Sequence, residues 1–317
     1  MGLKRYLSNL FRHDRNTRRQ LNDLSLRLDN QSKELHAIKE LQRKAYLQDK
    51  VMNSTEMGVS AQKLCDEEVV VSLTSYGPRI NEVYLAIESI MQGTVKPNRI
   101  ILWLSEDEFK GKRLPVSLQK QQERGLEIAF YKDIRSYKKI IPAMMQYPGS
   151  CIITIDDDLM YEFDLVEHLI NAHLNSPDEV CACRMHHITL NEKGEPKGYL
   201  QWQMEVDPKT QSNLNFLTTG GGTLFPPHCF VDEFFNEEKF MTLCPYADDV
   251  WVNSMIWMSN RKISKVYTHS KQGCDYMEIS LEQENALSNE NTNPENCRND
   301  AQIKAVFDKY QLYSFLV

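Results

Sequence analysis

A chain of 317 residues is long enough for one large domain or two modest ones, each with a substantial core. Hydrophobic residues make up 41% and charged residues 26%, as in soluble globular proteins, and no apolar run has the length of a membrane span or the form of a secretory signal. The net charge of −7 is uneven, because residues 1–63 hold 13 basic and 7 acidic residues whereas the remainder holds 24 and 37. The composition predicts a cytoplasmic protein with a basic arm and an acidic body, and such a body argues against nucleic acid as a partner.

The eight cysteines are scattered along the chain, and no two of them form a C-x-x-C pair. This spacing favours reduced thiols over a disulfide framework or a zinc site. Cys181 and Cys183 are expected to share one face of a strand as ordinary core residues.

Residues 1–20 have the pattern of a short basic amphipathic helix. Four apolar residues fall near one helical face among six basic residues: Leu3, Leu7, Leu10 and Phe11, with Lys4, Arg5, Arg12, Arg15, Arg18 and Arg19. Such a helix can lie on an anionic membrane surface, which predicts a peripheral contact with the inner face of the cytoplasmic membrane. The alternative is a solvated basic tail.

Residues 21–50 show a heptad pattern typical of a coiled-coil helix. Position a falls on residues 21, 28, 35 and 42, and position d on residues 24, 31, 38 and 45. A seam this short gains most from a partner helix, so the pattern predicts a homo-oligomer, and the alternative is a helix packed on its own body. Residues 51–67 lose the periodicity and form a predicted linker to a globular domain at 68–317.

In the first half of this domain the expected elements alternate between strand and helix. Strands are predicted at 69–74, 99–104, 126–131, 151–155 and 180–188, with helices at 82–92, 117–124 and 163–174 and another that ends near Pro148. This alternation predicts an α/β fold with a mainly parallel sheet.

Three consecutive aspartates follow the apolar strand at 151–155. In an open α/β sheet, ligands bind beyond the carboxyl ends of the strands, where Asp156, Asp157 and Asp158 are expected. Continued extension would point Asp156 and Asp158 to one side and Asp157 to the other. Converging carboxylates repel each other unless a cation neutralises them, so the pattern predicts a Mn²⁺ or Mg²⁺ site. The alternative is a solvated turn that caps the next helix.

Basic residues precede the aspartates. Arg135, Lys138 and Lys139 fall where a phosphate group would approach the acid-bearing strand.

Further along the chain, a run of three glycines, with Gly221 and Gly222 as its second and third members, would let the backbone come close to a bound ligand, and the alternative is a flexible hairpin tip.

Two later acids and a histidine complete the candidate residues. Asp248 and Asp249 open a helix that runs to Met258, and therefore stand at its positive end either as functional acids or as helix caps. His269 ends a late strand, where a histidine is either a ligand or a structural residue. The chain is expected to close with a helix at 301–309.

The order of four stretches resembles a bacterial glycosyltransferase of the GT-A type, close to the family 2 enzymes. These stretches lie within residues 68–270 and read VVVSLTSYGPRI, the Asp156-Asp157-Asp158 strand end, TTGGGTLFPP and YADDVW. The resemblance implies a Rossmann-like GT-A domain after the helical arm. It also implies metal-dependent transfer of a sugar from a nucleoside-diphosphate sugar, UDP-sugar foremost, to a glycan or lipid-linked glycan, as in capsule or O-antigen synthesis.

The resemblance also implies roles for individual residues. The D-x-D motif of the family maps onto Asp156-Asp157-Asp158, with Asp158 a metal ligand and Asp156 near the ribose or a metal-bound water. Thr74, Tyr76 and Arg79 would hold the nucleotide, and Lys138 or Lys139 the diphosphate. The acid pair of inverting members matches Asp248-Asp249, with Asp249 as the base, and a late metal-binding histidine matches His269. The acid that the family usually carries at the end of the second strand is replaced by Leu102-Trp103-Leu104-Ser105.

Two other functions compete with this one. A sugar-phosphate nucleotidyltransferase has a similar core but usually opens with a glycine-rich loop, whereas SLTSYGPR has one glycine. A coiled-coil scaffold with an inactive glycosyltransferase-like module would not need three aspartates.

Overall fold

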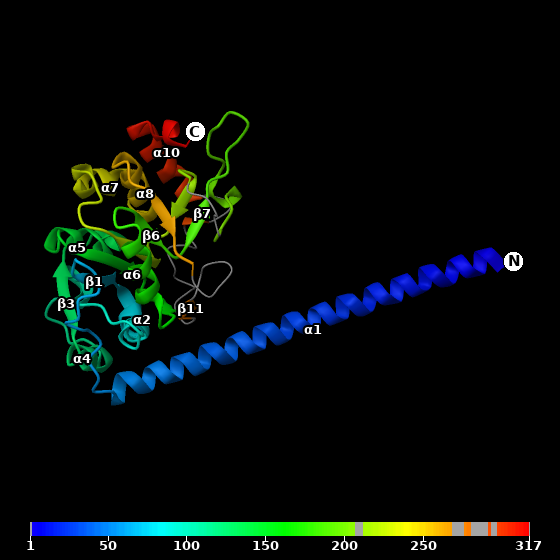
Figure 1. Ribbon diagram of the computed structural model, residues 1–317, viewed down its shortest axis with the longest axis horizontal. Coiled ribbons are helices and arrows are strands. Elements are labelled where there is room, and N and C mark those ends of the chain that lie inside the picture. Colours follow the sequence, from blue (N-terminus) through cyan, green and yellow to red (C-terminus); the bar gives the residue numbers. More distant parts are fainter. Residues whose placement is uncertain (1, 207–211, 268–275, 280–290, 293–296, 317) are drawn as a thin grey trace. The chain divides into compact units, whose positions relative to one another are not determined.

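The structure is a computed structural model that describes residues 2–206, 212–267, 276–279, 291–292 and 297–316. The side chains of residues 2–21 and 23 lie outside this description. The chain divides into two compact units, residues 1–49 and 50–317 (Figure 1).

Helix α1 (Gly2–Asn53) runs without a break. The sequence contains neither glycine nor proline between residues 3 and 57, so nothing in this stretch interrupts a helix. The predicted helical arm is confirmed, although the helix extends three residues into the predicted linker at 51–67. Four apolar residues of the heptad seam are each more than half exposed in the single chain: Leu24, Leu28, Leu35 and Ile38. None of the described helices combines the length and the apolar character needed to cross a bilayer.

The second unit is built on a seven-stranded sheet with the order β10-β6-β9-β4-β1-β2-β3. Strand β9 is antiparallel to its two neighbours, β4 and β6, and the other neighbouring pairs are parallel. The predicted α/β fold with a mainly parallel sheet is confirmed. The strands are β1 (Val69–Thr74), β2 (Arg99–Ser105), β3 (Leu126–Tyr131), β4 (Cys151–Ile155), β6 (Val180–Ala182), β9 (Gly221–Phe225) and β10 (Ile263–Lys265).

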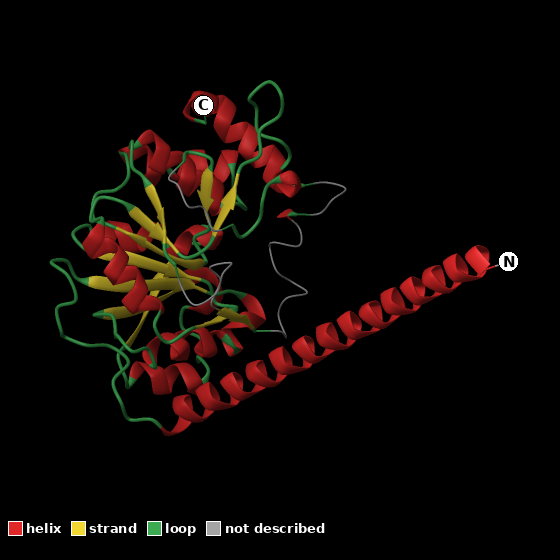
Figure 2. Cartoon of the chain, turned by 45° about the vertical axis from the view of Figure 1, so that its right-hand side comes forward, coloured by secondary structure: helices red, strands yellow, loops and turns green. Residues whose placement is uncertain are grey.

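Both faces of this sheet are covered, as Figure 2 shows with helices on either side of the strands. Neighbouring residues of a strand point to opposite faces, so Val70 and Ile152 join one core while Val71 and Ile153 join the other. Burial on both faces explains why β1 and β4 read as continuous apolar runs. The helices are α2 (Val83–Met91), α3 (Glu106–Phe109), α4 (Val116–Gln122), α5 (Ile141–Gln146), α6 (Leu165–Asn175), α7 (Glu237–Leu243), α8 (Asp248–Met258) and α10 (Arg298–Tyr310).

Two short strand pairs stand apart from the main sheet. Strand β5 (Leu159–Tyr161) pairs with β11 (Tyr276–Glu278), and β7 (Met185–His187) pairs with β8 (Asn215–Leu217). The prediction of one strand over 180–188 is therefore wrong, because the chain leaves the main sheet after Ala182 and begins β7 at Met185. The side chain of Arg184, at this break, donates to Thr218 Oγ1 at 2.6 Å and to Tyr276 Oη at 2.8 Å.

A buried ion pair anchors the segment that leads into β1. Arg124 Nη1 lies 2.9 Å and 3.0 Å from the two carboxylate oxygens of Glu88, and both side chains are almost fully buried. Arg124 Nε also donates to the carbonyl of Glu56 at 2.7 Å. One guanidinium therefore connects α2, the end of α4 and the segment before β1.

Replacing Arg124 with methionine is expected to reduce the free energy of unfolding by about 3–5 kcal/mol, because Glu88 would remain buried without a cation to balance its charge. Urea denaturation would measure the loss. Lys120→Met removes an exposed cation that lies 3.2 Å from Glu123, and is the matched control, with an expected change below about 0.5 kcal/mol. Equal effects of the two substitutions would show that the Arg124–Glu88 pair has no special importance.

Candidate active site

A cavity of about 520 Å³ lies beyond the carboxyl ends of β1 and β4. Its wall contains residues from the end of β1, the turns after β1 and β3, the end of β4 and the start of α8. These elements bring together ten of the predicted site residues: Thr74, Tyr76, Arg79, Lys138, Lys139, Asp156, Asp157, Asp158, Asp248 and Asp249. His269 lies outside the described residues.

Arg79 holds two of the three aspartates that follow β4. Its Nη1 donates to Asp157 Oδ1 at 2.8 Å and to Asp158 Oδ2 at 3.1 Å, and Ser75 Oγ donates to Asp157 Oδ2 at 2.6 Å. Strand β4 ends at Ile155 and the chain turns at once, so the expected alternation of the aspartates does not continue past the strand. Asp157 and Asp158 consequently share one cation.

Lys139 joins the end of β4 to the start of α8. Its buried Nζ lies 2.7 Å from Asp156 Oδ1 and 3.1 Å from Asp248 Oδ2. Although burial acts in the opposite direction, Asp156 and Asp248 raise the pKa of Lys139 above its usual value, so the lysine stays charged. Burial likewise opposes but does not overcome the effect of Lys139 on Asp156, whose pKa is held below its ordinary value.

Asp249 has a different environment from Asp156. Its Oδ1 accepts a hydrogen bond from the backbone N–H of Thr219 at 2.8 Å and lies 2.7 Å from Thr219 Oγ1. Burial and then the charge of Asp248 raise the pKa of Asp249 to about 6, against the opposing effects of Lys139 and Thr219. A carboxylate with this pKa can accept a proton near neutral pH.

Asp157 and Asp158 are also harder to ionise than an ordinary aspartate. Burial raises the pKa of Asp157 to about 6 despite the charge of Arg79. Burial and then the charge of Asp156 raise the pKa of Asp158 above its ordinary value. At Asp157 and Asp158, burial and neighbouring acids therefore outweigh the charge of Arg79.

The cavity wall as a whole fits a divalent cation. It includes eight acidic and five basic side chains, so the acids outnumber the bases by three. Asp156 and Asp158 offer hard oxygen ligands, but within the described residues no group of three or more His, Cys, Asp or Glu side chains converges on one point here. A magnesium-like ion commonly uses one or two carboxylates together with water and substrate phosphates, which matches this donor set.

The glycine-rich segment, in which Gly220 lies in a turn and Gly221 and Gly222 begin β9, allows close packing and does not line the cavity. A Cβ on Gly220 would lie 1.6 Å from Asp156 Oδ2, and one on Gly221 would lie 2.4 Å from Arg184 Cβ. Gly222 has φ +90 and leaves room for Leu165. Gly221 and Gly222, which were expected to approach a ligand, are not part of the cavity wall. The segment brings other side chains close instead, because only glycine leaves the space that they occupy.

Lys138 and Glu108 are placed differently from what the sequence suggested. Lys138 lies in the cavity wall, but its ammonium group is already paired with Asp133. The sequence has no acid at the end of the second strand, yet Glu108 of α3 lines the cavity three residues further on and accepts from Gly77 N at 2.8 Å.

Several residues of the cavity carried little or no signal in the sequence. Ser75 lies between the predicted site residues Thr74 and Tyr76, and Thr219 directly precedes the three glycines. The sequence could therefore have indicated both residues. Arg184 and His186 follow no motif, and they reach the cavity only because the chain breaks between β6 and β7.

Comparisons with known proteins identify no family. No protein-family model and no curated protein sequence matches the chain. Similar solved structures include a mannosyltransferase from Pyrobaculum calidifontis in complex with GDP-Man and Mn²⁺, at 10% identity and a TM-score of 0.40, covering 73% of this chain and 63% of that chain. A CMP:2-keto-3-deoxy-manno-octonic acid synthetase complexed with CTP has 12% identity and a TM-score of 0.36, covering 62% of this chain and 88% of that chain.

A third similar structure is glucosyl-3-phosphoglycerate synthase from Mycobacterium tuberculosis in complex with Mn²⁺, uridine diphosphate and phosphoglyceric acid. Its identity is 12% and its TM-score 0.29, and the match covers 37% of this chain and 43% of that chain. Similarity at this level does not indicate an activity. The function must therefore be argued from the cavity itself.

Proposed function

We propose that the protein is a metal-dependent glycosyltransferase that moves a sugar from a nucleoside-diphosphate sugar to a glycan or lipid-linked glycan. The observation that carries this proposal is the meeting of five aspartates, Arg79 and Lys139 in one cavity at the carboxyl edge of a mainly parallel sheet. Ligands of α/β proteins bind at such an edge. The excess of acidic over basic side chains disfavours a bare anionic substrate and supports a cation beside any diphosphate.

The donor nucleotide is proposed to lie along the end of β1. Tyr76 is 38% exposed beside the Arg79 guanidinium, so its ring can stack on a nucleobase. Thr74, Arg79 and Glu108 lie in the same wall and can bind the ribose and base through hydrogen bonds. Lys139, held between Asp156 and Asp248, places positive charge next to the diphosphate position, with Lys138 close by.

A bound Mn²⁺ or Mg²⁺ would be held by Asp158 and Asp156 and would supply positive charge that stabilises the diphosphate leaving group. His269 is a further proposed ligand from the sequence. Asp157 keeps Arg79 in place through the 2.8 Å contact, and Arg79 in turn fixes the position of Asp158.

Asp249 is the proposed general base. The acceptor hydroxyl loses its proton to the Asp249 carboxylate as its oxygen forms a bond to the anomeric carbon, and the bond from that carbon to the diphosphate breaks. This single displacement inverts the anomeric configuration. Thr219 orients the carboxylate, and Asp248 stays paired with Lys139.

A sugar-phosphate nucleotidyltransferase is the second candidate, because it would need a similar cation beside phosphates. The two functions differ in their products, since a glycosyltransferase releases a nucleoside diphosphate and a nucleotidyltransferase releases pyrophosphate from a nucleoside triphosphate. A scaffold would release neither. The basic segment 1–20 supports a lipid-linked acceptor in surface polysaccharide synthesis at the inner face of the cytoplasmic membrane. Co-sedimentation with anionic vesicles would measure the membrane binding that this requires.

Asp158→Asn is expected to remove the Mn²⁺-dependent part of nucleotide binding, because it removes a charged ligand of the proposed metal. Thermal unfolding with UDP or GDP, each with and without Mn²⁺, measures this through the stabilisation that a bound ligand gives. Asp107→Asn is the matched control, since Asp107 is an exposed acid of α3 outside the cavity wall. If Mn²⁺ and nucleotide stabilise Asp158→Asn as much as they stabilise the wild type, the metal assignment is refuted.

Asp249→Asn is expected to lower kcat by roughly 10²- to 10⁴-fold while leaving Mn²⁺-dependent nucleotide binding intact. Because the base acts when deprotonated, kcat/KM of the wild type should rise with pH through about 6, the pKa of Asp249. Asp157 also has a pKa of about 6, so the rising part of the pH profile must be assigned to one of these two acids. Thr219→Val removes a hydrogen bond that lowers the pKa of Asp249, and should move this part of the profile to higher pH whereas Thr219→Ser should not. If the rising part of the pH profile stays at the same pH in Thr219→Val, it belongs to a group other than Asp249.

The heptad seam of residues 21–50 is proposed to pair with a second copy of the chain. Leu28→Glu with Leu35→Glu places charge at two exposed a positions, and is expected to reduce the molar mass in multi-angle light scattering to that of a monomer. Leu26 is equally exposed but occupies position f, so Leu26→Glu should leave the assembly unchanged. A wild type that is already monomeric at micromolar concentration would end the proposal.

A further inference from the structure

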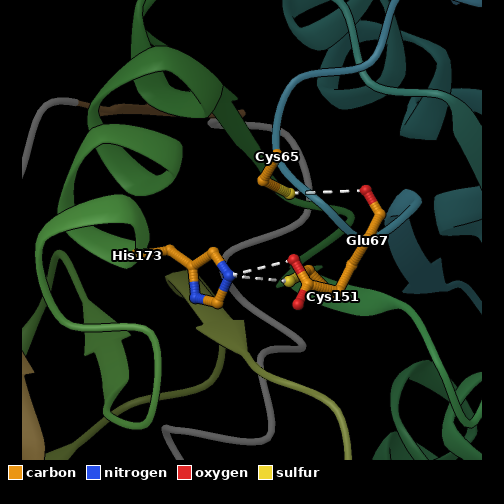
Figure 3. A group of neighbouring side chains, drawn as sticks. All are labelled: Cys65, Glu67, Cys151 and His173. Carbon is orange, nitrogen blue, oxygen red and sulfur yellow. Dashed lines mark hydrogen bonds and ion pairs between the residues drawn. The ribbon is translucent and has the colours of Figure 1, made fainter.

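Four side chains meet at the amino end of β4, away from the cavity at its carboxyl end. Cys65 and Glu67 belong to the segment before β1, Cys151 is the first residue of β4, and His173 lies near the end of α6. One ligand atom from each lies within 4.8 Å of the others (Figure 3). The backbone brings these elements together, because Cys151 N donates to the carbonyl of Glu68 at 2.9 Å.

Hydrogen bonds account for only part of the spacing of these atoms, since Cys65 Sγ donates to the backbone carbonyl of Glu67 at 3.4 Å. His173 Nε2 lies 3.4 Å from Cys151 Sγ and 3.4 Å from Glu67 Oε2, and a ring nitrogen of neutral imidazole has one proton or one lone pair for both. An N–H···O hydrogen bond is normally about 2.7–3.2 Å long, so the contact with Glu67 is long, whereas 3.4 Å is ordinary for the contact with the Cys151 sulfur. Bond lengths of about 2.0–2.3 Å from a tetrahedral zinc ion place its ligand atoms roughly 3.3–3.8 Å apart, which accommodates both contacts.

The other ring nitrogen gives no reason for the orientation of His173. Its Nδ1 is buried and has no hydrogen-bond partner among the described residues. The ring is nevertheless turned so that Nε2 points at the Cys151 sulfur and the Glu67 carboxylate, as Figure 3 shows. A cation bound at Nε2 would account for this orientation, and the ring proton would then lie on Nδ1.

The burial of the group suits a structural metal with a route of entry. Cys65, Cys151 and His173 are buried, whereas the Glu67 side chain is 29% exposed. A cation can therefore enter past Glu67 and be enclosed by the two sulfurs and the imidazole. The described cysteines are free, so both thiols are present to act as ligands.

We propose that Cys65, Glu67, Cys151 and His173 form a structural zinc site. Two thiolates, one imidazole and one carboxylate are the donor types that Zn²⁺ uses, and four protein ligands complete a tetrahedral sphere. Binding releases the two thiol protons to solvent, and the Zn²⁺ complex with two thiolates and one carboxylate has a net charge of −1. The ion ties the segment before β1 to the start of β4 and to α6.

Because the sequence has no C-x-x-C pair, its cysteine spacing argued against a zinc site. That reasoning applies to ligands that are close in sequence, whereas these ligands come from three elements separated by up to 108 positions, at residues 65, 67, 151 and 173. Cys181 is likewise a buried thiol of this core, but is not part of the group, and it provides a matched comparison.

The zinc content of the full chain, purified under reducing conditions without added metal, can be measured by elemental mass spectrometry. We expect about one zinc per chain. Cys65→Ser should lose most of that zinc, and Cys181→Ser should retain it. Adding Co²⁺ to the chelator-treated wild type should give thiolate-to-cobalt charge transfer and tetrahedral d–d bands, both of which are absent in Cys65→Ser.

Glu67→Gln is a milder second variant because its side chain is partly exposed, and it should weaken zinc retention in competition with a chromogenic chelator. Chelation should lower the unfolding temperature of the wild type and of Asp158→Asn equally, which separates this site from the proposed Mn²⁺ site. A wild type without zinc that gives no cobalt spectrum would overturn the proposal. A Cys65–Cys151 disulfide found after alkylation of the protein isolated without reductant would also overturn it.

Discussion

Lys139 and Arg79 each bind two acids, and Lys139 joins acids that are far apart in the sequence. Lys139 lies 2.7 Å from Asp156 and 3.1 Å from Asp248, and Arg79 contacts Asp157 and Asp158. In a buried cavity, unpaired charges of one sign repel each other strongly because water screens them little. The two cations therefore decide whether the acids can stand close together. The acidic side chains of the cavity wall still outnumber the basic ones, and the proposed Mn²⁺ or Mg²⁺ site rests on this excess.

Strand β4 connects the two groups of candidate ligands. Cys151 begins the strand and the three aspartates follow Ile155, its last residue. All five residues of the strand are buried, and β1 and β9 pair with it on either side. A strand held in this way fixes the position of side chains at both of its ends more tightly than a surface loop does. The proposed zinc ion at the amino end would add a constraint at the point where the strand enters the sheet.

The sequence was informative where function follows from the direction of strands. Parallel strands place their carboxyl ends at one edge, so the acids after β4 could be expected beside Thr74 and Arg79 without knowledge of the fold in detail. Contacts that depend on distant pairing could not be expected. Arg184 reaches the cavity through a break between two strands and bonds to Tyr276, 92 positions away. The group around Cys151 was missed for the same reason, because its four members share no local spacing.

The two proposed metal sites differ in what completes them. At the amino end of β4, four side chains would close the coordination sphere, so the ion could bind before any substrate arrives. In the cavity, the described acids supply only part of a sphere, and a diphosphate would supply the rest. In the proposed site, metal and nucleotide would each raise the affinity of the cavity for the other by the same factor, because coupling between two ligands is reciprocal. A nucleotide without metal would meet an excess of carboxylates, and a metal without nucleotide would have too few ligands. On this proposal the cavity would select the metal–nucleotide complex over either component alone.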